Sequence, residues 1–238
     1  MGCNSSKQVQ IQQANTSSGE FQTVRGDLYV AWISTPCRAT FMTCAALKIK
    51  PNFKPLDLFK GETRTPEFQA INPFHTLPTY VDGDFKLWES RAIMAYLVTT
   101  FGGPDHALYP RDPKKRAAID NVLNADHSTF YKTVSEWIFP QILKKEPGSD
   151  EKLAEVKKAF KILNDYYLKD RQYVTGNQMS IADFSVLATV TFTELVDLDL
   201  SEFPNIVDWC NRMKKLPYME KCNEGLYEGK KRLAESSN

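Results

Sequence analysis

Residues 27–38 read DLYVAWISTPCR, and they show how the chain begins to fold. Asp27–Ile33 is apolar and rich in β-branched and aromatic residues, a pattern typical of a buried strand. Ser34 and Thr35 follow, and Pro36 suits the first turn of a helix. Cys37–Lys48 then has helical spacing. The stretch predicts a strand that passes directly into a helix, with Ser34 at the corner between them.

Elements of both types follow as far as Gly103. A second strand is predicted near Phe53–Asp57, and Asp82-Gly83 is a hairpin signal between two short strands, Thr79–Val81 and Phe85–Leu87. Glu89–Thr100 is predicted to be a helix that the following glycines and proline stop. The order β-α-β-(short helix)-β-β-α predicts an α/β, thioredoxin-like domain with a mixed four-stranded sheet over residues 26–104.

From Pro113 onward the pattern predicts helices only. One long helical stretch runs from Lys114 to about Phe139, and Ser149 begins a second helix. Two more follow, Ser180–Leu195, which starts with a capping box of Ser180 and Asp183, and Phe203–Leu216. Residues 105–112 are the predicted linker, so residues 113–238 are predicted to form an all-helical domain.

Composition excludes several classes of function. The chain has 238 residues with 30 Lys and Arg against 29 Asp and Glu, a balance that argues against a nucleic-acid binder. Five cysteines without paired spacing favour reduced thiols over a disulfide framework. The sequence contains no metal-site motif, so no metal is expected. The longest strongly apolar stretch, near Phe184–Phe192, is too short to cross a bilayer.

The first seven residues, MGCNSSK, fit the pattern for N-myristoylation. Removal of Met1 would expose Gly2, Ser6 occupies the required position, and Cys3 is a candidate for palmitoylation. A single myristoyl chain binds a membrane only marginally, so Cys3 would supply the second signal. Residues 8–25 are rich in Gln, Ser, Thr and Asn and are interpreted as a flexible spacer. Residues 1–25 are thus predicted to be an acylated tail on the cytoplasmic face of a membrane; the alternative is a chance Met-Gly start.

Three spaced motifs carry a resemblance to a known family. They are NPFHTLPT at 72–79 followed by Asp82-Gly83, LWESRAI at 87–93 ending in Tyr96-Leu97, and SIAD at 180–183. Together they resemble the cytosolic glutathione S-transferases, and within them the theta and insect delta/epsilon group. The resemblance covers about residues 27–215. It implies the fold of that family, glutathione as co-substrate with no other cofactor, and a homodimer.

The chemistry of such an enzyme points to Ser34. The nucleophile is the glutathione thiolate, which a hydroxyl donor and a helix N-terminus would stabilise. The resemblance places the activating serine of the theta and delta classes at Ser34, in the run STPCR. Three other interpretations remain open at this point: Ser34 as an ordinary N-cap, Tyr29 as the activator, and Cys37 as the reactive thiol of a glutaredoxin-like enzyme.

The same resemblance assigns glutathione contacts to the other motifs. Leu77-Pro78 matches a cis-proline turn, whose exposed backbone can pair with the peptide. Ser90 and the free N–H groups beside it can hold the γ-glutamyl carboxylate, while Glu89 can pair with the α-amino group. Arg91 either reaches the same carboxylate or faces solvent, and the remaining contact, to the glycyl end, falls to His75.

The pocket for the second substrate is expected along the long helix, where the family places it. The candidates are Asn124, Phe130, Tyr131 and Val134, and an apolar lining would suit small hydrophobic electrophiles. The sequence therefore predicts a glutathione transferase that conjugates glutathione to such electrophiles or reduces organic peroxides. The alternative is a non-catalytic module of the same fold that serves as an adaptor or scaffold.

Overall fold

Four strands form one sheet in the order β2-β1-β3-β4 in the computed structural model, which describes residues 20–235. β1 (Gln22–Val30) pairs parallel with β2 (Ile49–Pro55) and antiparallel with β3 (Thr79–Asp82). β3 pairs antiparallel with β4 (Phe85–Trp88) across the hairpin. The mixed four-stranded sheet that the sequence predicts is therefore confirmed.

β1 differs from its predicted bounds because it begins at Gln22, within the segment interpreted as a spacer. Gln22 pairs with Ile49, and the register then shifts before Asp27. Gly26, at φ +96°, allows this irregularity, since a Cβ there would lie 2.3 Å from the Tyr80 hydroxyl oxygen. This part of the strand was not predicted from the sequence because residues 22–25 are mostly polar. Their backbone pairs with β2 ahead of the register shift, but most of their side chains face solvent.

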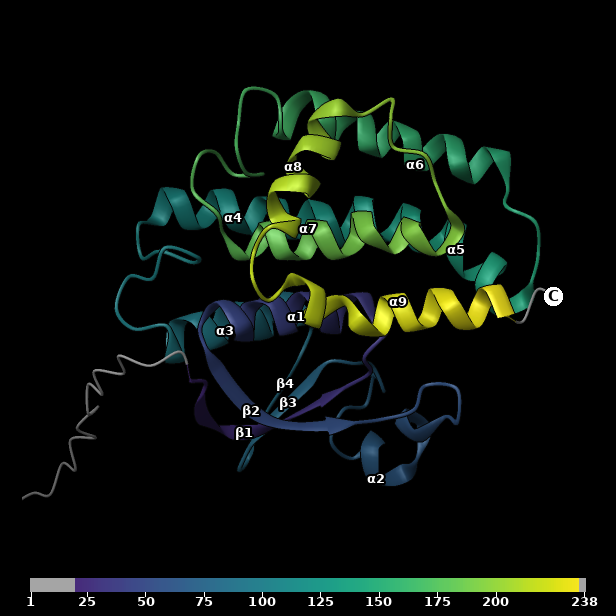
Figure 1. Cartoon of the computed structure of the whole chain (residues 1–238). Helices are drawn as coiled ribbons and strands as arrows, with labels where there is room; N and C mark the ends of the chain where they lie inside the picture. The colour runs from purple at the N-terminus through teal and green to yellow at the C-terminus, as the bar shows by residue number, and fades with distance from the viewer. Residues whose placement is uncertain (1–19, 236–238) are drawn as a thin grey trace, which may run out of the picture.

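Helices lie on both faces of the sheet (Figure 1). α1 (Thr35–Ala46) and α3 (Ser90–Phe101) separate the sheet from the helical half of the chain. On the opposite face lies the short α2 (Pro66–Gln69), which follows the 3-10 helix η1 (Glu62–Arg64). α1 and α3 each have buried residues on several sides, because each packs against the sheet and against the helices above it.

The helical half begins with one continuous run. It consists of α4 (Pro113–Ala125), a π-helical turn η2 (Asp126–Phe130) and α5 (Tyr131–Lys144). α6 (Asp150–Ile162) follows and ends in a second π-helical turn, η3 (Leu163–Tyr167). The long helical stretch predicted from about 114 to 139 is thus present and extends to Lys144.

α7 (Ile181–Phe192) is the central helix of this half, and all of its residues are buried. It starts with the predicted capping box, in which the Ser180 N–H donates to the Asp183 carboxylate at 2.8 Å. A 3-10 turn, η4 (Thr193–Val196), and α8 (Pro204–Lys214) follow it. No helix within residues 20–235 is long and apolar enough to cross a membrane.

The last helix, α9 (Met219–Glu235), is absent from the elements that the sequence predicted. Its two glycines look like helix breakers, but they permit a close approach to the turn that precedes Ser34. A Cβ on Gly225 would lie 2.5 Å from the backbone of Trp32, and one on Gly229 would lie 2.3 Å from the Ile33 side chain. α9 therefore braces the turn between β1 and α1.

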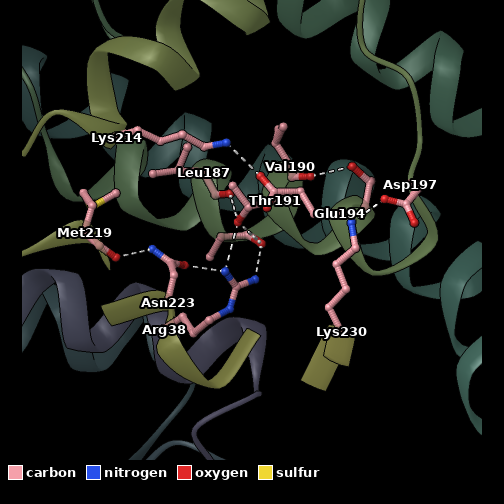
Figure 2. A network of polar contacts seen from close by, with 12 residues as sticks. Arg38, Leu187, Val190, Thr191, Glu194, Asp197, Lys214, Met219, Asn223 and Lys230 are labelled. Carbon is pink, nitrogen blue, oxygen red and sulfur yellow. Dashed lines mark hydrogen bonds and ion pairs between the residues drawn. The ribbon is translucent and has the colours of Figure 1, made fainter. Parts of the chain in front are cut away.

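Arg38, from the run STPCR, joins the two halves of the chain (Figure 2). It is fully buried, and its guanidinium donates to the Ala188 carbonyl at 2.8 Å and to the Thr191 hydroxyl at 2.9 Å, both on α7. It also donates to the Asn223 side-chain oxygen on α9 at 2.6 Å. Burial lowers the pKa of Arg38 to about 10. The three acceptors bind the two terminal nitrogens of a group that would be costly to bury without hydrogen bonds, while its Nε atom has no partner among the described residues.

Candidate active site

The motifs around Ser34, Leu77 and Glu89 meet at one end of the sheet because of the strand directions. Tyr29 of β1 lies opposite Thr79 of β3, which in turn lies opposite Trp88 of β4. β1 and β4 run toward this end and β3 starts from it, since both pairings are antiparallel. The residues that follow β1 and β4 and those that precede β3 therefore gather there.

Ser34 occupies the N-cap position of α1 and is half-buried, with an extended backbone. Its hydroxyl makes no capping hydrogen bond with the helix, and the first turn of α1 carries no acidic residue. Ser34 is therefore the N-cap residue by position, but its hydroxyl does not cap the helix. The positive end of the α1 dipole is open to an anionic ligand at this point.

The two competing candidates have other roles. Cys37 is fully buried, and burial raises the pKa of its thiol to about 11, although hydrogen bonds from Ser34 and from the Ala31 backbone oppose the shift. A buried, protonated thiol is a poor nucleophile, which argues against a glutaredoxin-like reaction. Tyr29 packs edge-on against Phe68, with ring centroids 5.5 Å apart, and this contact is typical of a sheet face.

The loop before β3 is held by Asn72, a residue for which the sequence suggested no role. Its buried side-chain amide donates to the Thr79 hydroxyl at 2.9 Å and to the Thr76 carbonyl at 3.1 Å. The loop that it fixes contains His75, which is half-buried at φ +46°, and it ends in a cis Leu77–Pro78 bond. The cis bond agrees with the turn that the resemblance implied.

Glu89 and Ser90 form the corner between β4 and α3. Glu89 is exposed and has φ +67°, a conformation that is costly for a residue other than glycine. Ser90 is buried at the first position of α3, and the first turn of that helix also lacks an acidic residue. The N-termini of α1 and α3 thus both point their partial positive charge at the same end of the sheet.

Arg91 does not face solvent, because its side chain is only 14% exposed. It forms an ion pair with Asp126, which is fully buried at the start of η2. The Asp126 carboxylate also accepts hydrogen bonds from Ser185 and from Thr189, the latter at 2.8 Å. Sequence reasoning missed Asp126, although an acid on the apolar face of a long helix, between Val122 and Phe130, is a signal of a buried polar partner.

A cavity of about 590 Å³ opens at the turn that precedes Ser34, and Ile33 lines it although Ser34 itself does not. Its walls come from four places: the turn at Trp32 and Ile33, the loop after β2, the end of α5 and the last turns of α9. The residues that line it with apolar side chains include Trp32, Ile33, Leu58, Phe59, Ile142 and Leu143. Phe59 is 76% exposed and Leu143 is 59% exposed, so both present free apolar surface to a ligand.

None of the four residues predicted to form the electrophile pocket lines this cavity. Phe130 and Val134 are buried in the core at 1% and 0% exposure. Tyr131 packs beneath the Arg91 guanidinium, 5.9 Å from its ring centre, and Asn124 is exposed. The long helix does supply a wall, but two turns further on, because its apolar residues at regular spacing face the core.

The comparisons with known proteins agree with this geometry. Residues 26–99 match the N-terminal domain model of glutathione S-transferases, and residues 92–217 match the C-terminal domain model. The chain therefore belongs to the glutathione S-transferase family, and it is an enzyme of the glutathione transferase type. It is 42% identical over 211 residues to glutathione S-transferase D6 of Drosophila melanogaster, which covers 88% of this chain and 97% of the relative.

Solved structures of insect enzymes have the same fold. A delta-class glutathione transferase of Nilaparvata lugens matches with a TM-score of 0.81 at 35% identity, covering 87% of this chain and 99% of that one. A glutathione transferase homologue of Drosophila mojavensis, solved with bound glutathione, matches with a TM-score of 0.82 at 31% identity, covering 89% and 97%. The resemblance to the delta-like group and the fold that it implied are thereby confirmed.

Proposed function

We propose that this enzyme conjugates glutathione to small hydrophobic electrophiles and that Ser34 is the catalytic residue. One observation carries the proposal: the Ser34 hydroxyl makes no capping bond with the backbone of α1, yet it lies at the positive end of this helix and directly follows the turn that lines an apolar cavity. A hydroxyl that donates to the glutathione sulfur would stabilise the thiolate over the thiol. The cavity would hold the electrophile next to that sulfur.

The chemical step needs no further group. Glutathione loses its thiol proton to water, and the thiolate attacks the electrophilic carbon. A sulfur–carbon bond forms, and the leaving group, such as a halide, departs with its electron pair. With an organic peroxide, the same thiolate would attack the O–O bond to release an alcohol, and a second glutathione would convert the resulting sulfenic acid into glutathione disulfide and water.

The remaining residues at this end of the sheet would hold the tripeptide. Ser90 and the open N-terminus of α3 suit the γ-glutamyl carboxylate, and the exposed Glu89 suits the α-amino group. The backbone of Leu77 would pair with the cysteinyl residue as an added strand, and His75 would contact the glycyl carboxylate. Arg91 is assigned to positioning, since its charge is already paired with Asp126.

The test is glutathione-dependent turnover of 1-chloro-2,4-dinitrobenzene. Ser34→Ala should lower kcat by about 10²- to 10³-fold, as removal of one donor to a developing anion does, with little change in glutathione affinity. Ser34→Thr, which keeps a hydroxyl, should recover part of the rate. Ser201→Ala, at an exposed serine outside the site, is the matched control. Unchanged turnover in Ser34→Ala would disprove the role of Ser34.

Assembly and location form a second part of the proposal. We infer a homodimer from the family, and light scattering of the purified chain at micromolar concentration measures it directly.

We also propose that myristoylation of Gly2 and palmitoylation of Cys3 tether the enzyme to the cytoplasmic face of a membrane; both residues lie outside the described range 20–235. Intact-mass analysis from a eukaryotic host should show acylation that Gly2→Ala abolishes, and an unmodified Gly2 would refute the tether.

A further inference from the structure

A second hollow, of about 790 Å³, lies along the first half of α9 and shares Trp32, Gly225 and Glu228 with the cavity at the turn before Ser34. Its walls come from α1, the edge strand β2, the start of α9 and the residue that precedes β1. Three aromatic rings form one wall: Trp32 and Phe41 lie 5.0 Å apart, and Phe53 lies 5.6 Å from Phe41. This groove is of ordinary ligand size and has an apolar wall, and of its three rings only Trp32 also lines the cavity proposed to hold the electrophile.

The groove opens where the N-terminal tail enters the fold. Phe21 lines it, is 52% exposed, and directly precedes β1. Gly2 lies 19 positions before Phe21. Nineteen residues span at most about 65 Å when fully extended, so an acyl group on Gly2 is within covalent reach of a groove that Phe21 lines.

We propose that this groove binds the myristoyl chain attached to the enzyme's own Gly2. The proposal rests on the acylation of Gly2 put forward above, and it names the site that the acyl chain occupies when it is not in a membrane. The enzyme then alternates between a closed form, with the chain in the groove, and a form whose chain is inserted in lipid.

The charges at the rim favour this occupant over a free fatty acid. Two lysines, Lys50 and Lys221, and two glutamates, Glu224 and Glu228, lie on the lining, and Lys221 is ion-paired with Glu224. The rim therefore carries no net charge to attract a carboxylate. A myristoyl group joined to Gly2 through a neutral amide brings only its hydrocarbon chain and suits such a rim.

Attachment also supplies the affinity. A myristoyl chain partitions into a bilayer with a constant on the order of 10⁴ M⁻¹, and a short flexible tether gives an effective concentration on the order of 1 mM. If the groove binds the myristoyl chain with the same constant as a bilayer, the product of this constant and the effective concentration is about 10. The groove would then be occupied about ten times more often than empty. A competing ligand should bind about tenfold more weakly to the myristoylated enzyme than to the unmodified one.

The experiment compares two forms of the full chain, unmodified and myristoylated by a co-expressed N-myristoyltransferase. The probe is the methyl ester of the fluorescent fatty acid cis-parinaric acid, which carries no carboxylate and so resembles the amide-linked myristoyl chain. The unmodified form should bind the probe, and the myristoylated form should bind it about tenfold more weakly. In the unmodified form, Phe21→Asp and Ala45→Trp, two changes on the groove lining, should weaken probe binding. Tyr166→Asp, at another exposed aromatic residue, in the helical half, should not weaken it.

A second readout is binding of the myristoylated forms to phosphatidylcholine vesicles. Ala45→Trp fills the groove, so it should release the chain and raise the vesicle-bound fraction above that of the parent. Equal probe affinity for the two forms, or no probe binding by the unmodified form, would overturn the proposal even where Gly2 is shown to be acylated. An unmodified Gly2 in a eukaryotic host would instead overturn the tether itself, and with it this natural occupant.

Discussion

Arg91 of α3 is ion-paired with Asp126 of the helical half, beside the end of the sheet where the candidate active site lies. The pair is almost fully enclosed: the Arg91 side chain is 14% exposed and that of Asp126 is 0% exposed. Hydroxyls of Ser185 and Thr189 complete the shell of the carboxylate. The start of α3, which is proposed to bind the γ-glutamyl group, is therefore fixed by a charge in the other half of the chain.

Asp126→Ala should destabilise the protein by about 3–5 kcal/mol, because it leaves Arg91 as a buried charge without a partner. Denaturation in urea, followed by tryptophan fluorescence, measures the change. Asp165→Ala removes the acid of the exposed ion pair with Lys161 and should leave the midpoint unchanged. Equal effects of the two substitutions would show that the Arg91 pair is not a structural tie.

Arg38→Met should cost about 2–4 kcal/mol, since it leaves the buried acceptors on Ala188, Thr191 and Asn223 without their donor. Adding Asn223→Leu removes one of these orphaned acceptors. The double variant should therefore be no less stable than Arg38→Met alone, although Asn223→Leu by itself should destabilise the parent. Simple additivity of the two losses in urea denaturation would contradict the hydrogen-bond network of Figure 2.

The two glycines of α9 should respond differently to alanine. At Gly225 the new Cβ would meet the backbone of Trp32, which cannot move without shifting the turn before Ser34. We expect Gly225→Ala to destabilise the protein by about 1–3 kcal/mol and to lower kcat/KM about tenfold. At Gly229 the obstacle is the end of the Ile33 side chain, which can rotate, and alanine is the better helix former. A Gly229→Ala variant that loses as much activity as Gly225→Ala would contradict this account.

Asp183 gives the protein a specific dependence on pH. Burial raises the pKa of its carboxyl to about 6, although hydrogen bonds from Val174, Ser180 and Trp209 oppose the shift. Between the unfolded pKa of about 3.9 and the folded value, the native state binds more protons than the unfolded state, so this group's contribution to stability falls as pH rises, by about 3 kcal/mol in total.

The comparison of the parent with Asp183→Asn isolates this effect, because other titrating groups cancel. The stability of the parent relative to the variant should fall between pH 4 and pH 6 and stay level above that range. Unfolding free energies from urea denaturation at half-unit pH intervals provide the measurement. A constant difference across the range would mean that Asp183 titrates alike in the two states.

The sequence predicted the order of the strands and helices better than it predicted the surfaces around the candidate site. The family resemblance assigned Ser34, Leu77 and Glu89 to one site, and they do lie at one end of the sheet because strand order and direction bring three strand ends there. Asp126 was missed since its partner Arg91 lies 35 positions away, and periodicity within one helix says nothing about contacts with another. The cavity walls Phe59 and Leu143 were missed because an exposed apolar residue on a loop or helix end has no periodic signature.

The meeting of three strand ends at one edge also bears on how such an enzyme can change over evolutionary time. The groups proposed to grip glutathione all come from residues 34–90, whereas α5 and α9 supply much of the neighbouring cavity. Substitutions at Ile142 or Leu143 can therefore alter which electrophile is accepted without touching the grip on the shared co-substrate. Substrate range and thiol chemistry can therefore change independently. The exception is the Arg91–Asp126 ion pair, which fixes the position of α3 relative to the helical half.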